Sequence, residues 1–211
     1  MISPRALPVA AAAAVAALIV AVADPAAALV RSTNVFASNR LRSAVPDAAF
    51  VFTPGAPANL RQLPFGSLSL GAVDQHPVLG GADTQMAYTV ASIHPGATLP
   101  AHLHPRATEL DYIVHGTIQT VIVEENGSGR STIVVKAAAG QLSVIPEGLI
   151  HSQTCVSAEP CRFVATLNSA DPGTLLVGSS VCALPDFQVA AALGNGFSPA
   201  AARAFCAGGV L

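Results

Sequence analysis

The middle of the chain carries short runs of β-favouring residues separated by turn-forming residues. Between residues 65 and 168, runs rich in Val, Ile, Thr and Phe alternate with Gly, Pro, Asn and Asp at the spacing typical of a sandwich or barrel. We therefore predict an all-β barrel over residues 65–170, with strands at 86–93, 110–114, 118–123, 132–135, 141–145, 151–155 and 162–167. The expected core side chains are Ile113, Val121, Val144, Ile145 and Phe163.

The segments on either side of this region have different patterns. Residues 24–64 are rich in Ala, Pro, Asn and Arg with weak periodicity, which predicts an N-terminal arm with one short strand at 49–52. Residues 171–211 are predicted to form a C-terminal helical extension. There Asp186 is expected to cap a helix over 187–193, and Ser198, followed by Pro199, to cap a second helix that ends at Gly208.

The first 23 residues have the pattern of a secretory signal peptide. A positive start is followed by an Ala-rich apolar run that ends in Ala21-Val22-Ala23, a small-x-small cleavage pattern. We predict cleavage before Asp24, with a second possible cut after Ala28, and a secreted, extracellular protein without stable membrane insertion. A membrane anchor is the alternative, because the run approaches the ~20 residues that span a bilayer.

Composition narrows the range of partners. Only 10% of residues are charged and 52% are hydrophobic, against roughly 25% and 45–50% in ordinary globular chains. Part of the excess lies in the leader, and the rest points to surface covered in a homo-oligomer. The ten basic residues are scattered singly, which disfavours nucleic acid as a partner. The acidic residues Asp111, Glu124, Glu125 and Glu147 are expected to be solvated loop charges.

Four cysteines lie in the last third of the chain, at positions 155, 161, 182 and 206. An even number in a chain with a secretory pattern indicates disulfides, and three connectivities are open. We prefer Cys155–Cys161 across a short hairpin and Cys182–Cys206 within the C-terminal segment. A zinc site is less favoured because the chain has no Cys-x-x-Cys pair.

The loop at 125–129 contains Asn126-Gly127-Ser128, which is both a hairpin signal and an N-glycosylation sequon.

Two segments bring together residues that can bind a metal. His102 and His104 are two apart, so in a strand they point to the same face. Glu109 can return to that face after the bend at Pro105, and His151 opens a strand after a Pro/Gly turn. Three imidazoles and one carboxylate suit manganese or iron and admit nickel, copper or zinc. With four protein ligands, an octahedral ion keeps two positions for water or substrate.

These segments resemble the two cupin motifs in their germin form. Residues 96–116 match Gly-x5-His-x-His-x4-Glu-x6-Gly and residues 140–151 match Gly-x5-Pro-x-Gly-x2-His at every signature position, and residues 167–173 are also germin-like. The resemblance implies a jelly-roll β-barrel, secretion, and a manganese ion on His102, His104, Glu109 and His151. It also implies dimers or trimers of dimers, assembled through the arms and the C-terminal helices.

Several positions depart from the germin pattern. Germins carry a disulfide near the mature N-terminus, whereas this chain has no cysteine before Cys155. Germins with oxalate oxidase activity have two pocket asparagines that align with Thr89 and Leu99, and a third that aligns with Cys155. Leucine cannot hydrogen-bond a carboxylate. We therefore favour a superoxide dismutase that acts on superoxide. The alternatives are a non-catalytic wall-associated or storage-type cupin and an oxidase of a small carboxylate other than oxalate.

Overall fold

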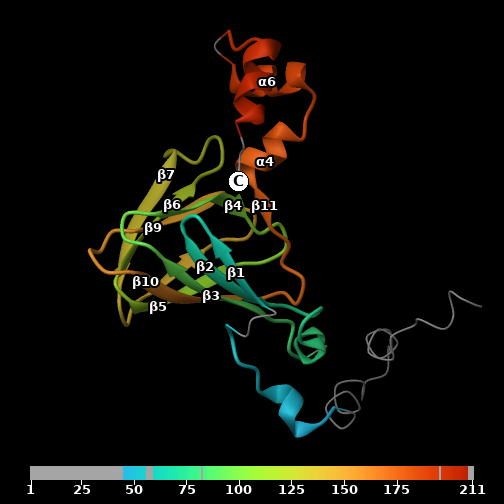
Figure 1. Cartoon of the computed structure of the whole chain (residues 1–211), viewed down its shortest axis with the longest axis vertical. Coiled ribbons are helices and arrows are strands. Elements are labelled where there is room, and N and C mark those ends of the chain that lie inside the picture. The colour runs from blue at the N-terminus through green and yellow to red at the C-terminus, as the bar shows by residue number, and fades with distance from the viewer. Residues whose placement is uncertain (1–44, 56–58, 82, 195, 209–211) are drawn as a thin grey trace, which may run out of the picture.

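The computed structural model describes residues 45–55, 59–81, 83–194 and 196–208. These residues form a β-barrel with a helical extension that stands away from it (Figure 1). The predicted signal peptide (residues 1–23) and residues 24–44 of the predicted arm lie outside the described residues. Among the described residues, none of the helices has the length and apolarity needed to cross a bilayer. The elements are η1 (Asp47–Phe50), β1 (Leu60–Leu63), β2 (Gly66–Gly71), η2 (Pro77–Gly80), β3 (Ala87–Ile93), β4 (Thr98–Leu103), β5 (Glu109–His115), β6 (Thr117–Val123), β7 (Thr132–Ala138), β8 (Leu142–Ile145), β9 (His151–Cys155), β10 (Cys161–Leu167), β11 (Leu175–Leu176), α4 (Val177–Cys182), α5 (Asp186–Leu193) and α6 (Pro199–Ala207).

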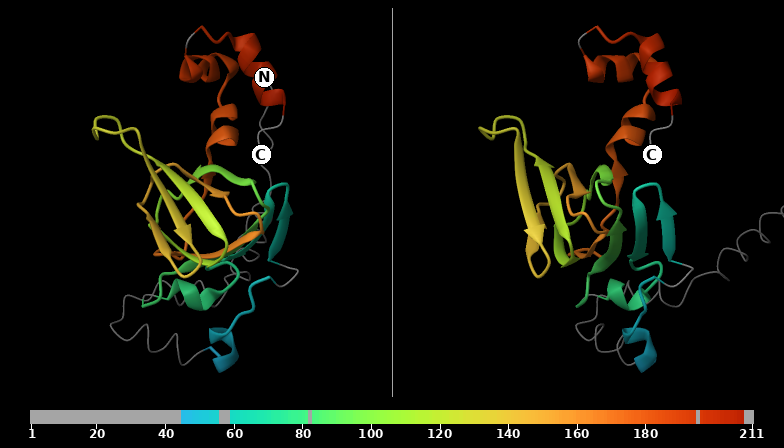
Figure 2. Two further views of the ribbon diagram at one scale, coloured as in Figure 1. Left: turned by 90° about the vertical axis from the view of Figure 1, so that its left-hand side faces the viewer. Right: turned by 60° about the vertical axis from the view of Figure 1, so that its left-hand side comes forward.

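The barrel consists of two antiparallel sheets that face each other (Figure 2). One sheet has the order β1-β2-β3-β10-β5-β8, and the other has the order β11-β4-β9-β6-β7. Burial alternates along the central strands, as it does for strands with one face toward a core. The predicted all-β jelly-roll barrel is therefore confirmed.

The barrel interior is divided into an apolar part and a polar part. The apolar cluster includes Ile93, Ile113, Ile118 and Phe163. The polar part contains the buried residues His102, Glu109, Asp111, Thr120, Ser143, His151 and Gln153. The polar part is where the side chains with metal-binding chemistry gather.

One predicted core residue points the other way. Ile113, Ile145 and Phe163 are buried as expected, but Val144 is 57% exposed and the prediction for it is wrong. The reason is the two-residue period of β8, in which Ser143 and Ile145 take the inward positions and turn Val144 outward. Val121 is only half-buried.

The predicted strand at 49–52 is also wrong. Residues Asp47–Phe50 form the 3₁₀ helix η1, which follows Pro46. A proline fixes its own φ and suits the position just before a helical turn.

Strands β1, β2, β4 and β11 and helix α4 were not among the predicted runs. In β2, serine, leucine and glycine stand in place of the β-branched and aromatic residues that mark a strand.

The C-terminal helices form a small unit with its own core. Val189, Ala190 and Ala202 are buried together, and the disulfide Cys182–Cys206 joins α4 to α6. The predicted cap at Ser198 is confirmed, because its hydroxyl accepts a hydrogen bond from the Ala201 N–H at 3.2 Å.

Asp186 does not cap α5. Pro185 holds the capping position, and the Asp186 carboxylate instead lies 2.7 Å from Nε of Arg203. The second disulfide joins Cys155 to Cys161, so both preferred pairings are confirmed.

Candidate metal centre

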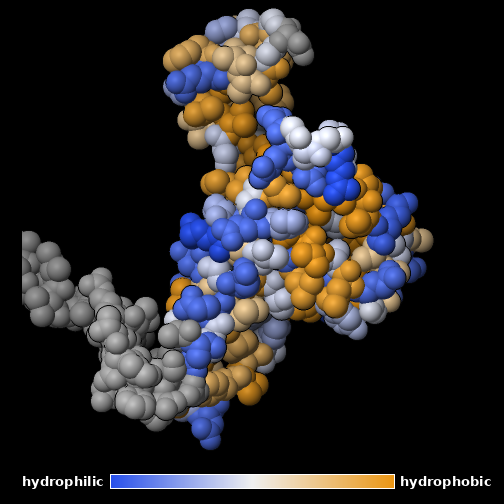
Figure 3. Space-filling view, turned by 180° about the vertical axis from the view of Figure 1, so that it is seen from behind, coloured by the Kyte–Doolittle hydropathy of each residue, from blue (hydrophilic) through white to orange (hydrophobic). Residues whose placement is uncertain are grey.

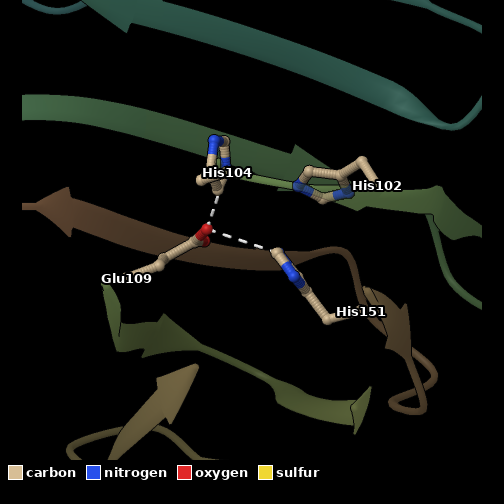
Figure 4. A group of neighbouring side chains, drawn as sticks. All are labelled: His102, His104, Glu109 and His151. Atoms are coloured by element: carbon tan, nitrogen blue, oxygen red, sulfur yellow. Dashed lines mark ion pairs between the residues drawn. The ribbon is translucent and has the colours of Figure 1, made fainter. Parts of the chain in front are cut away.

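The four predicted ligand residues come together from both sheets. His102 lies in β4, His104 directly follows this strand, and His151 opens β9; both strands belong to the five-stranded sheet. Glu109 opens β5 of the six-stranded sheet. His102 and His151 are register partners across β4 and β9. Figure 4 shows the four side chains converging, with one possible ligand atom from each within 4.8 Å of all the others.

The centre is buried and rich in groups without hydrogen-bond partners. Oε2 of Glu109 lies 2.9 Å from Nε2 of His104 and 3.4 Å from Nε2 of His151. Oε2 of Glu109 and Nε2 of His151 are nevertheless buried without a hydrogen bond of good geometry among the described residues. Such orphaned atoms cost about 1–3 kcal/mol each. A cation bound between them would satisfy both, so these residues fit a metal.

Backbone carbonyls fix the orientation of the three imidazoles. Nδ1 of His102 is 2.9 Å from the carbonyl oxygen of Pro100, and Nδ1 of His151 is 2.9 Å from that of Leu149. Nδ1 of His104 is 2.6 Å from the carbonyl oxygen of Gly173. A carbonyl only accepts, so each Nδ1 carries the proton and donates. Each Nε2 is thereby left with its lone pair for an ion.

Burial and mutual contact shift the pKa values of these groups. Burial lowers the pKa of His102 to about 4, and the nearby His151 adds to this effect, so the His102 imidazole is neutral at pH 7. Burial also acts to lower the pKa of His104, but contact with the Glu109 carboxylate outweighs it and raises this pKa. For Glu109, burial acts to raise the pKa, but contacts with His104, His151 and Asp111 leave it below its usual range. Glu109 therefore supplies one negative charge to the centre.

A second carboxyl group lies next to this ligand set. Asp111, predicted to be a solvated loop charge, is fully buried, so that prediction is wrong. Asp111 lies two residues after Glu109 in β5, so its side chain points to the same inward face of the strand. Nε2 of Gln153 donates to Oε1 of Glu109 and to Oδ2 of Asp111, both at 3.3 Å. Burial and the charge of Glu109 raise the pKa of Asp111 well above its usual value.

Asp111 and Gln153 were missed as neighbours of the site, although the sequence carried a signal for both. Each stands two residues after a predicted ligand, Glu109 in one case and His151 in the other. In a strand this spacing returns the side chain to the same face. The two-residue spacing from the predicted ligands would therefore have placed both side chains inside the barrel.

The positions that align with the pocket asparagines of oxalate-oxidising germins offer no amide. Leu99 and Cys155 are buried in the apolar cluster, and Cys155 is bound in a disulfide. Thr89 is half-buried in β3. Two of the three positions therefore present apolar or sulfur atoms, which do not bind a carboxylate.

Comparison with known protein families and sequences gives a consistent result. The profile of the family described as Cupin matches residues 65–196. Germin-like protein 1 of Brassica napus is 32% identical over 124 residues, which are 59% of this chain and 58% of that protein. Spherulin-1A of Physarum polycephalum is 39% identical over 47% of this chain and 40% of its own length. Oxalate oxidase 1 of Hordeum vulgare is 37% identical over 39% of this chain and 41% of its own length. The chain thus spans about 40% to 58% of the length of these relatives.

Solved structures share the same fold. An oxalate oxidase structure matches with a TM-score of 0.66 and 22% identity over 79% of this chain and 83% of that chain. Procruciferin, an 11S globulin from Brassica napus, matches with a TM-score of 0.63 and 20% identity over 72% of this chain and 38% of that chain. At this level of identity, the similarity establishes the architecture alone.

Proposed function

Because the chain belongs to the cupin family, we propose that it is a secreted, germin-like metalloprotein that binds one manganese ion and removes superoxide. The observation that carries the proposal is the buried set of three imidazoles and one carboxylate, whose ligand atoms lie within 4.8 Å of one another. These donors are neutral nitrogen and hard oxygen without sulfur, a combination that suits manganese or iron. Iron, nickel, copper and zinc are the alternative occupants.

The chemistry of dismutation is a pair of one-electron steps. A bound manganese ion would supply the +2/+3 couple, through which one superoxide loses an electron to become O₂ while a second gains it and takes two protons to become H₂O₂. The residues of the chain would hold the ion and bury it inside the barrel. His102, His104 and His151 turn their Nε2 atoms toward the centre because their Nδ1–H groups are bonded to carbonyls. Glu109 supplies the compensating negative charge.

Metal content and activity measured on one preparation test this proposal. Protein purified with manganese should contain about one ion per chain, and superoxide removal should rise in proportion to the manganese content. His151→Ala should lose the metal, because it removes one of the four ligands and leaves Oε2 of Glu109 without its neighbour at 3.4 Å. His94→Ala, which changes an exposed histidine outside the site, is the matched control. An His151→Ala protein with full metal content would refute the ligand assignment.

A second class of function is separated by the same preparation. Protein that is fully loaded with manganese but does not remove superoxide would fit the non-catalytic alternative, a wall-associated or storage-type cupin. The storage-type function is supported only by the fold that the chain shares with an 11S globulin.

Oxidation of a small carboxylate is the remaining alternative, favoured by the sequence similarity to oxalate oxidases. Leu99 and Cys155 argue against oxalate itself, because neither side chain can donate a hydrogen bond of amide strength to a carboxylate. Hydrogen peroxide release should therefore be screened with a set of small mono- and dicarboxylates and O₂. Turnover of oxalate at the rate of the best substrate would contradict this reading of the pocket.

We further propose that the mature protein is extracellular and forms a homo-oligomer, either a dimer or a trimer of dimers. The disulfides support an oxidising compartment, and Asn126 lies on an exposed turn where a glycan could be attached. Apolar surface is visible on the barrel and on the helical extension (Figure 3). On the barrel it includes an outer strip of β5 and β8 in which Leu110 pairs with Val144 and Tyr112 with Leu142, all exposed. Light scattering on the mature protein tests the assembly, and a monomer at micromolar concentration would contradict it.

A further inference from the structure

A layer of polar side chains lies inside the barrel next to the candidate metal centre. It consists of Asp111, Thr120, Ser143 and Gln153, which are between 0% and 6% exposed. Asp111 and Ser143 come from the six-stranded sheet, whereas Thr120 and Gln153 come from the five-stranded sheet. We call this group the polar layer.

The members of the polar layer are close to one another. Asp111 is the register partner of Ser143 across β5 and β8, and Thr120 is the register partner of Gln153 across β6 and β9. Directly opposed residues have Cβ atoms about 4.5–5.5 Å apart. The hydrogen bond from Nε2 of Gln153 to Oδ2 of Asp111 connects the two pairs across the barrel. The four side chains therefore form one contiguous group.

Each member of the polar layer has a buried atom without a hydrogen-bond partner among the described residues. These atoms are Oδ1 of Asp111, Oγ1 of Thr120, Oγ of Ser143 and Oε1 of Gln153. A buried polar atom left unpaired is expensive, and such atoms in folded proteins are usually satisfied by protein or by ordered water. The strand register and the Gln153–Asp111 hydrogen bond bring the four side chains together, so their unpaired atoms point to a bound ligand that can both donate and accept hydrogen bonds.

We propose that the polar layer binds ordered water, at least one molecule held between Thr120, Ser143 and Gln153. Water fits because it can donate to the amide oxygen of Gln153 and to Oδ1 of Asp111 while accepting from the two hydroxyls. A monovalent cation could contact the oxygens but could not accept the hydroxyl protons. Of the two, only water satisfies the donors and the acceptors together.

This water gives the polar layer a role toward the metal ligand. Gln153 donates from Nε2 to Oε1 of Glu109 at 3.3 Å, and this contact lies on the other carboxylate oxygen from the one that faces His104 and His151. The water donates to Oε1 of Gln153 and so fixes the orientation of the same side-chain amide. Gln153 is therefore a positioning residue that keeps Glu109 Oε2 turned toward the histidines, and Thr120 and Ser143 act on it through the water. The assignment rests on the geometry of the polar layer and holds whichever metal occupies the centre.

Substitution of one hydroxyl separates a hydrated layer from a dry one. Thr120→Val removes Oγ1 with little change in shape. If Oγ1 binds water, we expect the urea midpoint of the metal-free protein to fall and the unfolding equilibrium constant to rise about fivefold, the effect of losing one hydrogen bond. If Oγ1 has no partner, removing it relieves a desolvation cost and the midpoint should rise, which would overturn the proposal. Thr154→Val on the opposite face of β9 is the matched control, because its hydroxyl bonds to Thr98 on the exposed side.

Two further measurements keep the test independent of folding in one variant. A high-resolution crystal structure of the wild-type protein should show a water within hydrogen-bond distance of at least two members of the polar layer. A dry layer, or a monovalent cation identified by anomalous scattering after a rubidium soak, would overturn the proposal. In the cobalt-loaded protein, Thr120→Val should shift the visible absorption bands through Glu109, and Thr154→Val should leave them in place. Unchanged bands in both variants would refute the positioning role.

Discussion

Burial of His102 should make the stability of the metal-free protein depend on pH. Burial lowers its pKa in the folded chain to about 4, from an ordinary value of 6.5. Between these two values the unfolded chain takes up a proton that the folded chain refuses, so protonation favours unfolding. Stability due to this group is therefore present above pH 6.5 and is lost as the pH falls toward 4.

The size of the effect follows from the shift. The difference between 6.5 and about 4 corresponds to a maximum of about 3 kcal/mol, of which roughly 2 kcal/mol is lost between pH 7 and pH 5. Urea unfolding of chelator-treated protein at half-unit pH intervals measures this loss. In His102→Gln, which cannot be protonated in this range, the slope between pH 7 and pH 5 should be shallower by that amount.

The comparison between the two proteins isolates His102 from the other titrating groups. His104 acts in the opposite direction, since its raised pKa favours the folded state at low pH, but it is present in both proteins. Metal-loaded wild-type protein provides a further comparison, because an ion on Nε2 competes with the proton. Equal pH slopes for wild type and His102→Gln would show that the His102 imidazole is not desolvated as the structure indicates.

Three other predictions concern stability and metal binding. Replacing Cys182 and Cys206 with serine should lower the stability of the helical extension by about 3.5 kcal/mol, the loop entropy for a separation of 24 residues, while elemental analysis should find the metal content unchanged. Gly96→Ala should cost about 1–2 kcal/mol in thermal or urea unfolding, because φ is +73° but the space for a Cβ is open. Gly116→Ala should cost more, because φ is +77° and the new Cβ would lie 2.8 Å from a disulfide sulfur; equal costs would contradict this reading. Glu109→Gln should weaken manganese binding by more than about 100-fold in equilibrium dialysis, because it removes the charge at the centre, and an unchanged affinity would count against Glu109 as a ligand.

The sequence predicted the barrel well because its strands carry local signals. Alternating β-favouring residues and Gly/Pro turns located the seven predicted strands to within a few residues, and β9 (His151–Cys155) was placed to the residue. The strands that were missed, such as β2 (Gly66–Gly71), owe their structure to pairing with β3 rather than to their own composition. The burial of Asp111 and the exposure of Val144 depend on which face of a strand meets the other sheet, and that is fixed by register.

The candidate site was predicted for a different reason. The spacing of His102, His104 and Glu109, combined with a histidine opening a later strand, is a pattern that few arrangements other than a metal centre require. The residues that surround the proposed ligands could not be predicted from the sequence. The carbonyl of Gly173 that holds His104 lies 69 residues away along the chain, and no local pattern reveals such a contact.

The four proposed ligands are divided between the two sheets, so a bound ion would report correct strand alignment. A slip of β9 by one residue would turn His151 away from the interior, and separation of the sheets would remove Glu109 from the histidines. Either error would leave the chain β-rich by circular dichroism but unable to chelate. If the proposed site binds its metal, the molar ratio of metal to chain would measure how many molecules in a refolded batch have reached the native pairing.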